Sequence, residues 1–183
     1  MNRQDLIHQL QIYQSFNEQE EADRQVMLGL LQTSDDIFYR TNLLAHFTAS
    51  AWVLNKAHTH VLMAFHNIYQ TYAWLGGHAD GEEDLLSVAL REVKEETGLD
   101  LIDYVHRGIV IFNYNDDEPL DMYLYTSKNF SGEIQECSEG DLKWIDKSEI
   151  YKLNLWEGDR IFFELLEKDA PFFHLILNYE NDT

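Results

Sequence analysis

The stretch that decides the fold is Gly76-Gly-His-Ala-Asp-Gly-Glu-Glu-Asp-Leu-Leu-Ser-Val-Ala-Leu-Arg-Glu-Val-Lys-Glu-Glu-Thr-Gly-Leu-Asp100. Its beginning is rich in glycine, and the residues that follow predict about four turns of helix with one apolar stripe, formed by Leu86, Leu90, Val93 and Thr97. Gly98 follows the last turn, where a left-handed residue commonly ends a helix. The pattern therefore predicts a glycine loop, a helix and a glycine stop.

Three carboxylates crowd one side of this predicted helix. Glu92, Glu95 and Glu96 stand at positions i, i+3 and i+4, so their side chains are neighbours and repel one another. Arg91 can pair with Glu95, but one guanidinium cannot neutralise three carboxylates. A solvated acidic face is the simple interpretation of such a run. A bound Mg²⁺ or Mn²⁺ explains it better, because both ions prefer clustered oxygen ligands.

The same residues match the pattern G-x5-E-x7-R-E-U-x-E-E-x-G-U, in which U is aliphatic, at every position: Gly77, Glu83, Arg91, Glu92, Val93, Glu95, Glu96, Gly98 and Leu99. The pattern is the Nudix box, and the chain resembles the Nudix hydrolases, pyrophosphohydrolases that cleave nucleoside diphosphates linked to another group. The resemblance implies the Nudix fold, a mixed β-sheet between helices.

The resemblance also implies roles for the box. Glu92 and Glu96 are expected to be the main metal ligands, with Glu95 a further ligand or the base that takes a proton from water. Glu83 is expected to hold Arg91, which orients the helix carboxylates.

Two further metal ligands are expected by resemblance. The backbone carbonyl of Gly76 often completes the metal shell in the family. A fourth acid commonly comes from a loop outside the box, and Glu139, which precedes Trp144 and its predicted strand, is the candidate. The alternative for Glu139 is a solvated loop acid.

Composition limits the functional classes. A chain of 183 residues suits one domain with a proper core. A formal charge of −20 argues against binding a nucleic-acid polymer and suits a small anionic nucleotide that arrives with a metal ion. Cys137 is the single cysteine, which excludes an internal disulfide and is compatible with a reducing cytosol. No apolar run is long enough for a membrane span or signal peptide, so a cytoplasmic protein is expected.

The order of elements predicts an α/β fold. Residues 1–40 read as a helical extension of two helices, the second capped by Ser15 or Asn17, and 41–183 as the Nudix domain. The extension is expected to cover a sheet face or to form an oligomer contact, such as a homodimer. A strand is expected at 44–55, with a neighbouring strand at 60–66 across a turn. Further strands are expected at 104–115, 120–127, 142–146 and 172–179. A helical turn is expected at 147–152 and an amphipathic helix at 159–168.

The histidines do not predict a metal site, since His46, His58, His60, His66 and His78 lack metal-binding spacing and lie on different predicted strands and loops. His66 or His78 is instead expected to contact a substrate phosphate.

The region 108–179 resembles the MutT-type oxidised-purine nucleoside triphosphatases. The resemblance implies that Trp156 stacks on the purine and that Asp159 hydrogen-bonds its edge; stacking suits any base, because every base has a π-face. The alternative is that Trp156 is a core aromatic and Asp159 caps a helix. Relatives of this branch often carry an asparagine shortly before the glycine pair, where Ala73 stands here.

The first half of the chain resembles a different bacterial Nudix branch of unassigned substrate. Natural recombination or an engineered chimera would each join two such halves. The expected activity is Mg²⁺-dependent hydrolysis of a nucleoside triphosphate, with 8-oxo-dGTP as a candidate, to a monophosphate and pyrophosphate. The alternatives are hydrolysis of ADP-ribose or a nucleotide sugar, and a nucleotide sensor that does not turn over.

Overall fold

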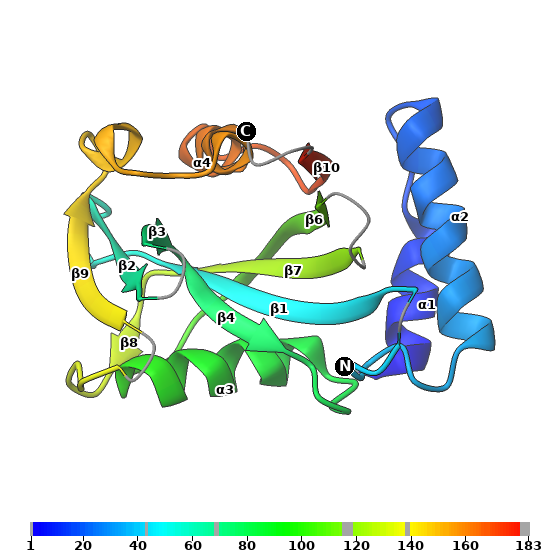
Figure 1. Cartoon of the computed structure of the whole chain (residues 1–183), viewed down its shortest axis with the longest axis horizontal. Coiled ribbons are helices and arrows are strands. Elements are labelled where there is room, and N and C mark those ends of the chain that lie inside the picture. The colour runs from blue at the N-terminus through cyan, green and yellow to red at the C-terminus, as the bar shows by residue number, and fades with distance from the viewer. Residues whose placement is uncertain (1, 43, 68–69, 115–118, 138–139, 180–183) are drawn as a thin grey trace.

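A computed structural model of the chain describes residues 2–42, 44–67, 70–114, 119–137 and 140–179 (Figure 1). The helices are α1 (Arg3–Ile12), α2 (Glu18–Thr33), α3 (Leu85–Thr97) and α4 (Glu157–Glu167), with a 3₁₀ turn at Ile150–Lys152. The strands are β1 (His46–Val53), β2 (His60–His66), β3 (Thr71–Ala73), β4 (Leu75–His78), β5 (Asp100–Leu101), β6 (Val105–Tyr114), β7 (Leu120–Ser127), β8 (Phe130–Ser131), β9 (Gly140–Asp146) and β10 (Phe173–Tyr179). The predicted mixed α/β fold is confirmed.

The main sheet has five strands in the order β10-β6-β7-β1-β4. It is mixed: β1 runs parallel to β7 and β10 parallel to β6, whereas β6 and β7 are antiparallel and β4 is antiparallel to β1. A second sheet has the order β3-β2-β9. In Figure 1 the main sheet lies between α3 and α4, with the α1–α2 pair at its far end.

Alternation along the strands gives the main sheet two buried faces. Phe47 and Ala49 of β1 pack in one core cluster with α1, α2 and the start of α3. Trp52, with the opposite parity, packs under α4 against Phe162 and Phe163. Both faces of the sheet are therefore covered, and the edge strand β4 lies beside α3.

The predicted pairing of β1 with β2 is wrong beyond its turn. The turn forms, with the Asn55 N–H donating to the His60 carbonyl at 3.0 Å, but only the isolated bridge between Leu54 and Val61 joins the two strands. β4 and β7 already occupy the two edges of β1, so β2 turns away and pairs with β3 and β9 instead.

Local signals set the helix ends. Asn17 caps α2, and its side-chain oxygen accepts from the N–H of Glu20 at 2.9 Å. Asp84 caps α3 in the same way, and Gly98 ends it in the left-handed conformation with φ of 79°, as predicted. None of the described helices is both long and apolar enough to cross a membrane.

Candidate active site at strand β4 and helix α3

Two box carboxylates lie against the glycine pair, which forms strand β4 rather than the predicted loop. The Gly76 N–H donates to Glu96 Oε1 at 2.9 Å. A Cβ on Gly77 would overlap the carboxylate of Glu92, with the Glu92 Cδ only 2.6 Å away. α3 buries Val93 beneath the sheet, so its neighbours Glu92 and Glu96 reach the backbone of the edge strand.

Arg91 joins the helix to that strand. Its guanidinium contacts Glu92 Oε1 at 2.9 Å and Glu95 Oε2 at 3.7 Å, and donates to the carbonyl of His78 at 3.2 Å. The Glu95 side chain is 64% exposed, against 17% for Glu92. Arg91 therefore holds the Glu92 carboxylate in an ion pair, whereas Glu95 projects toward solvent.

The expected pair between Glu83 and Arg91 needs correction. Glu83 instead receives Arg3 of α1, with Arg3 Nε 3.2 Å from Glu83 Oε1 and the Arg3 N–H donating to Glu83 Oε2 at 3.3 Å. Arg3 also donates to the carbonyls of Ser34 and Asp35, both at 3.1 Å. Arg3 stands 80 residues before Glu83 in the chain, so no local pattern indicates the contact. The first helix is thereby tied to the box.

The donor set suits part of a magnesium shell. Across residues 2–42, 44–67, 70–114, 119–137 and 140–179, no three His, Cys, Asp or Glu side chains are gathered as a complete metal site. Two carboxylates, Glu92 and Glu96, do converge on one backbone segment. Mg²⁺ is usually held by one or two carboxylates and completes its shell with waters and substrate phosphates, so this pair fits. Glu139, the expected fourth acid, lies outside the described residues.

His78 follows the glycine pair on β4. Its ring stacks on His46 with centroids 5.1 Å apart, and burial lowers its pKa to about 4, helped by Arg40 and His46. Its imidazole is therefore neutral at pH 7, and a phosphate contact would be a hydrogen bond rather than an ion pair. His66, the other expected phosphate contact, ends β2 in the second sheet, opposite Gly140 in register.

Trp156 and Asp159 lie together at the start of α4. The Trp156 side chain is 38% exposed and packs against Tyr114 and Tyr179, with ring centroids 5.6 and 4.9 Å away. Asp159 is buried, and its Oδ2 accepts the Trp156 N–H at 3.3 Å, as in a helix cap. Trp156 is thus no core aromatic, while Asp159 combines the capping contact with a buried carboxyl.

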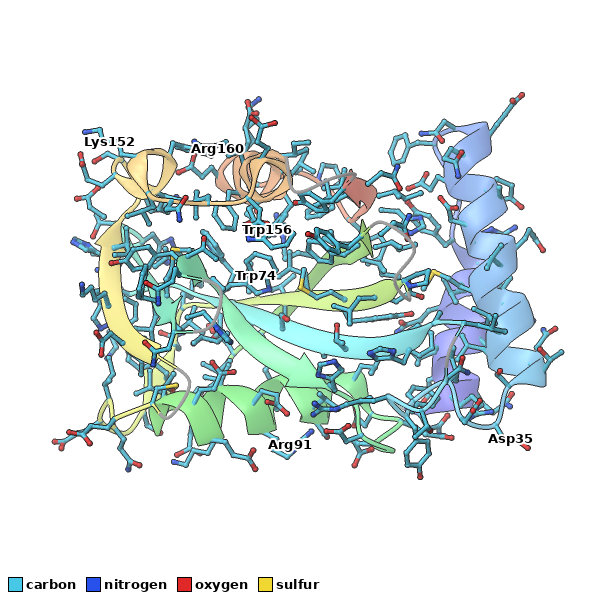
Figure 2. All side chains as sticks on the ribbon, in the orientation of Figure 1. Asp35, Trp74, Arg91, Lys152, Trp156 and Arg160 are labelled. Carbon is cyan, nitrogen blue, oxygen red and sulfur yellow. The ribbon has the colours of Figure 1, made fainter. Side chains whose placement is uncertain are left out.

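Sequence reasoning missed Trp74, which links this region to the glycine pair. Its ring stacks on Phe112 at 5.9 Å and its Nε1 donates to Met122 Sδ at 2.9 Å. Phe112 and Tyr114 are two residues apart in β6, so their side chains lie on the same face of the strand. The ring pair Trp74–Phe112 and the ring pair Tyr114–Trp156 together form an aromatic row. Figure 2 shows Trp74 and Trp156 between α4 and the main sheet, with Arg91 on α3 below it. Trp74 precedes Gly76 by two residues, and this position beside the glycine pair was the sequence feature that could have identified it.

Burial raises the pKa of Asp159 to about 7, against the hydrogen bond from Trp156 and the charge of Arg160, which lower it. The folded protein therefore holds this proton more tightly than the unfolded chain, and the resulting stability is full below about pH 4 and is lost as pH rises to about 7. Asp159→Asn keeps an oxygen for the cap and removes the titration. We expect the variant to gain roughly 2 kcal/mol on the wild type between about pH 5 and about pH 8, measured by urea unfolding. An unchanged difference between the two proteins across this range would contradict the raised pKa.

Comparisons with known proteins identify the family of the chain. A family model described as the NUDIX domain matches residues 44–166. The uncharacterized Nudix hydrolase YvcI of Bacillus subtilis is 26% identical over 109 residues, which cover 57% of this chain and 69% of that protein. The oxidized purine nucleoside triphosphate hydrolase of Danio rerio is 30% identical over 99 residues, which cover 53% of this chain and 63% of that protein.

Solved structures share the fold. The MutT protein of Bacillus halodurans superposes with a TM-score of 0.68 at 22% identity, over 74% of this chain and 91% of that one. The NUDIX domain of Shewanella oneidensis NrtR, crystallised with ADP ribose, superposes with a TM-score of 0.57 at 18% identity, over 77% of this chain and 96% of that one. At these identities the likeness establishes the architecture and leaves the substrate to the residues of the site.

Proposed function

The chain belongs to the Nudix hydrolases, and from this premise we propose that it hydrolyses a nucleoside triphosphate, preferably one with an oxidised purine, to a monophosphate and pyrophosphate. One observation carries the proposal: Glu92 and Glu96 converge on the glycine pair from which the aromatic row leads to Trp156. Phosphates at the carboxylate end and a base at the tryptophan end would match a nucleotide.

The box residues divide the work between them. Nudix hydrolases generally use divalent metal ions, and Mg²⁺ or Mn²⁺ held by Glu92 and Glu96 would neutralise phosphate charge and orient water. Arg91 fixes the Glu92 carboxylate and, through the His78 carbonyl, the distance between α3 and β4. Within the described part of the chain, the exposed Glu95 makes no backbone contact like the one that holds Glu96, and it is the candidate base for the proton of the attacking water.

The base end of the proposed site rests on Trp156 and Asp159. The part-exposed Trp156 ring offers a stacking surface, braced by Tyr114 and Tyr179. Asp159, with a pKa near 7, can donate or accept a hydrogen bond at neutral pH, which suits a purine edge that carries both donors and acceptors.

Trp156→Ala is expected to raise the KM for an 8-oxo-purine triphosphate about tenfold and to change kcat little, because base stacking on an aromatic ring is worth about 1–3 kcal/mol. Steady-state kinetics with 8-oxo-dGTP measures the effect. Trp156→Phe is the matched control, since it keeps a π-face and should lose less. Equal KM values for the wild type and the alanine variant would remove Trp156 from the base site.

The assay that tests the proposal compares 8-oxo-dGTP with ADP-ribose, each with Mg²⁺ and with chelator, and separates products by ion exchange. We expect metal-dependent conversion of 8-oxo-dGTP to its monophosphate and pyrophosphate. Cleavage of ADP-ribose alone would change the proposed substrate class to nucleoside diphosphates linked to a sugar. Binding of either compound without turnover would favour a sensor and overturn the enzymatic proposal.

A further inference from the structure

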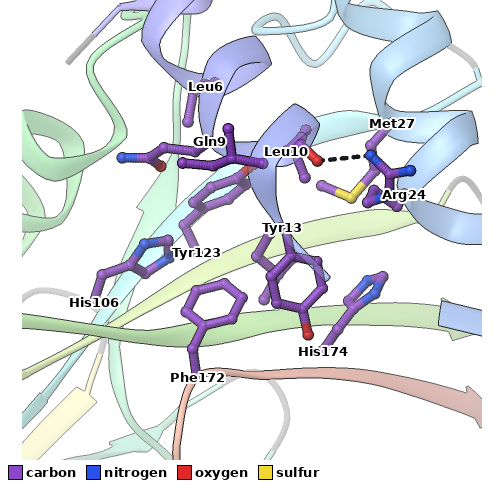
Figure 3. A pocket seen from close by; sticks show the side chains of 12 residues that line it. Leu6, Gln9, Leu10, Tyr13, Arg24, Met27, His106, Tyr123, Phe172 and His174 are labelled. Atoms are coloured by element: carbon purple, nitrogen blue, oxygen red, sulfur yellow. Dashed lines mark hydrogen bonds between the residues drawn. The ribbon is translucent and has the colours of Figure 1, made fainter. Parts of the chain in front are cut away.

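A cavity of about 240 Å³ lies between the α1–α2 pair and the main sheet (Figure 3). The helices contribute apolar groups such as Leu6, Leu10 and Met27, and the strands contribute Ile109, Tyr123 and His174. None of the described residues that line it belongs to the box, so the cavity is distinct from the proposed nucleotide site.

Three polar atoms of the lining residues are buried without a hydrogen-bond partner in the described part of the chain: Tyr123 Oη, His106 Nε2 and His174 Nε2. Tyr123 is only 1% exposed. Buried polar atoms are nearly always satisfied, because an unsatisfied one loses its hydrogen bonds to water and gains none in return. Three such atoms belong to residues that line one cavity, so a hydrogen-bonding ligand seated there is a candidate partner for them.

Flat rings form one wall of the cavity. His106 stacks on Tyr123 with centroids 5.3 Å apart and planes 18° from parallel, and Phe172 meets His106 edge-on at 5.0 Å. Tyr13, the residue that follows the end of α1, extends the wall, with its ring edge-on to Phe172 at 5.3 Å. In Figure 3 these four rings are grouped together. Such a wall favours a planar ligand, because aromatic rings pack best on one another.

The electrostatics of the lining favour an uncharged ligand. Burial lowers the pKa of His106 to about 4 and also lowers that of His174, so both imidazoles are neutral hydrogen-bonding groups at pH 7. The guanidinium of Arg24 is engaged by Glu21, 2.6 Å from Nη2, and by the Leu10 carbonyl, 2.9 Å from Nη1. A phosphate would find no unengaged cation among the described residues of the lining.

We propose that this cavity binds a small, uncharged heteroaromatic molecule of the free purine base class. Its ring would pack on the aromatic wall, and its polar edge would hydrogen-bond Tyr123, His106 and His174. The volume lies just below the roughly 300–1,000 Å³ of typical ligand sites, which suits one ring system without a sugar phosphate. The site does not depend on the proposed hydrolysis.

Adenine, added to the full chain, is the probe. Imidazole ¹⁵N NMR should show shifts of the His106 and His174 Nε2 resonances, and calorimetry gives the affinity. Tyr123→Phe removes one hydrogen bond while keeping the ring, so adenine should bind about three- to tenfold more weakly.

Tyr125→Phe is the matched control. Tyr125 lies two residues along β7, and its hydroxyl is also buried without a partner among the described residues, but it does not line the cavity. This variant should bind adenine as the wild type does, and Trp156→Ala should leave the histidine shifts unchanged. The proposal would be overturned if adenine shifted neither histidine, if both tyrosine variants weakened binding equally, or if adenosine monophosphate produced the same histidine shifts with equal affinity.

Discussion

Glu92→Gln is expected to lower kcat for the nucleoside triphosphate by roughly 10²- to 10⁴-fold, which corresponds to several kcal/mol of transition-state stabilisation. Glutamine keeps the size of the side chain beside Gly77 but removes the charge that pairs with Arg91 at 2.9 Å and that would bind the metal ion. Steady-state kinetics measures the loss, and thermal unfolding should show that the fold persists.

The control for this variant is Glu164→Gln on α4. Glu164 is an exposed helix glutamate that pairs with Lys168. The Glu164→Gln variant therefore loses the same charge far from the box and should keep wild-type turnover. If Glu92→Gln and Glu164→Gln were equally active, the catalytic assignment of Glu92 would be wrong. A metal titration by calorimetry adds a second readout, because the Glu92 variant should bind Mn²⁺ more weakly whatever its turnover.

The sequence predicts α3 well because its signals are local. The apolar stripe that includes Val93 is three to four residues in period, and Gly98 needs only its own missing Cβ to adopt φ of 79°. The turn at Asn55 is local as well. The pairing of the strands that flank this turn is not local, because β1 pairs with β7, which lies some seventy residues further along the chain.

In the candidate site, too, contacts within one helix are predictable from the sequence, whereas contacts between distant segments are not. Glu92, Glu96 and Arg91 come from one helix, so the box pattern alone brings them together. The contact between Glu83 and Arg3 and the aromatic row through Trp74 depend on the packing of distant elements, which a single sequence does not display. The glycine pair is predicted to lie in a loop, yet it forms part of the edge strand β4. There Gly77 leaves room for the Glu92 side chain of α3, which a Cβ would displace.

Gly77→Ala is expected to lower kcat about 10²-fold with little loss of stability, because the atoms that a new Cβ meets first all belong to the flexible Glu92 side chain. The methyl group fits only if that carboxylate moves, and a displacement near 1 Å at a catalytic group can cost such a factor. Gly76→Ala is the contrasting variant. Its φ of 153° suits glycine, and its Cβ would lie 2.6 Å from the Ala49 carbonyl oxygen, so it should unfold the protein instead.

A double-mutant cycle separates displacement of Glu92 from general damage to β4. If the alanine at position 77 acts by moving the Glu92 carboxylate, then the combination of Gly77→Ala and Glu92→Gln should be no slower than Glu92→Gln alone. Fully additive losses would mean that Gly77 serves the site through another contact. Because each single variant is expected to keep its fold, the kinetics of all four proteins can be compared at one temperature, and thermal unfolding of each shows whether that condition holds.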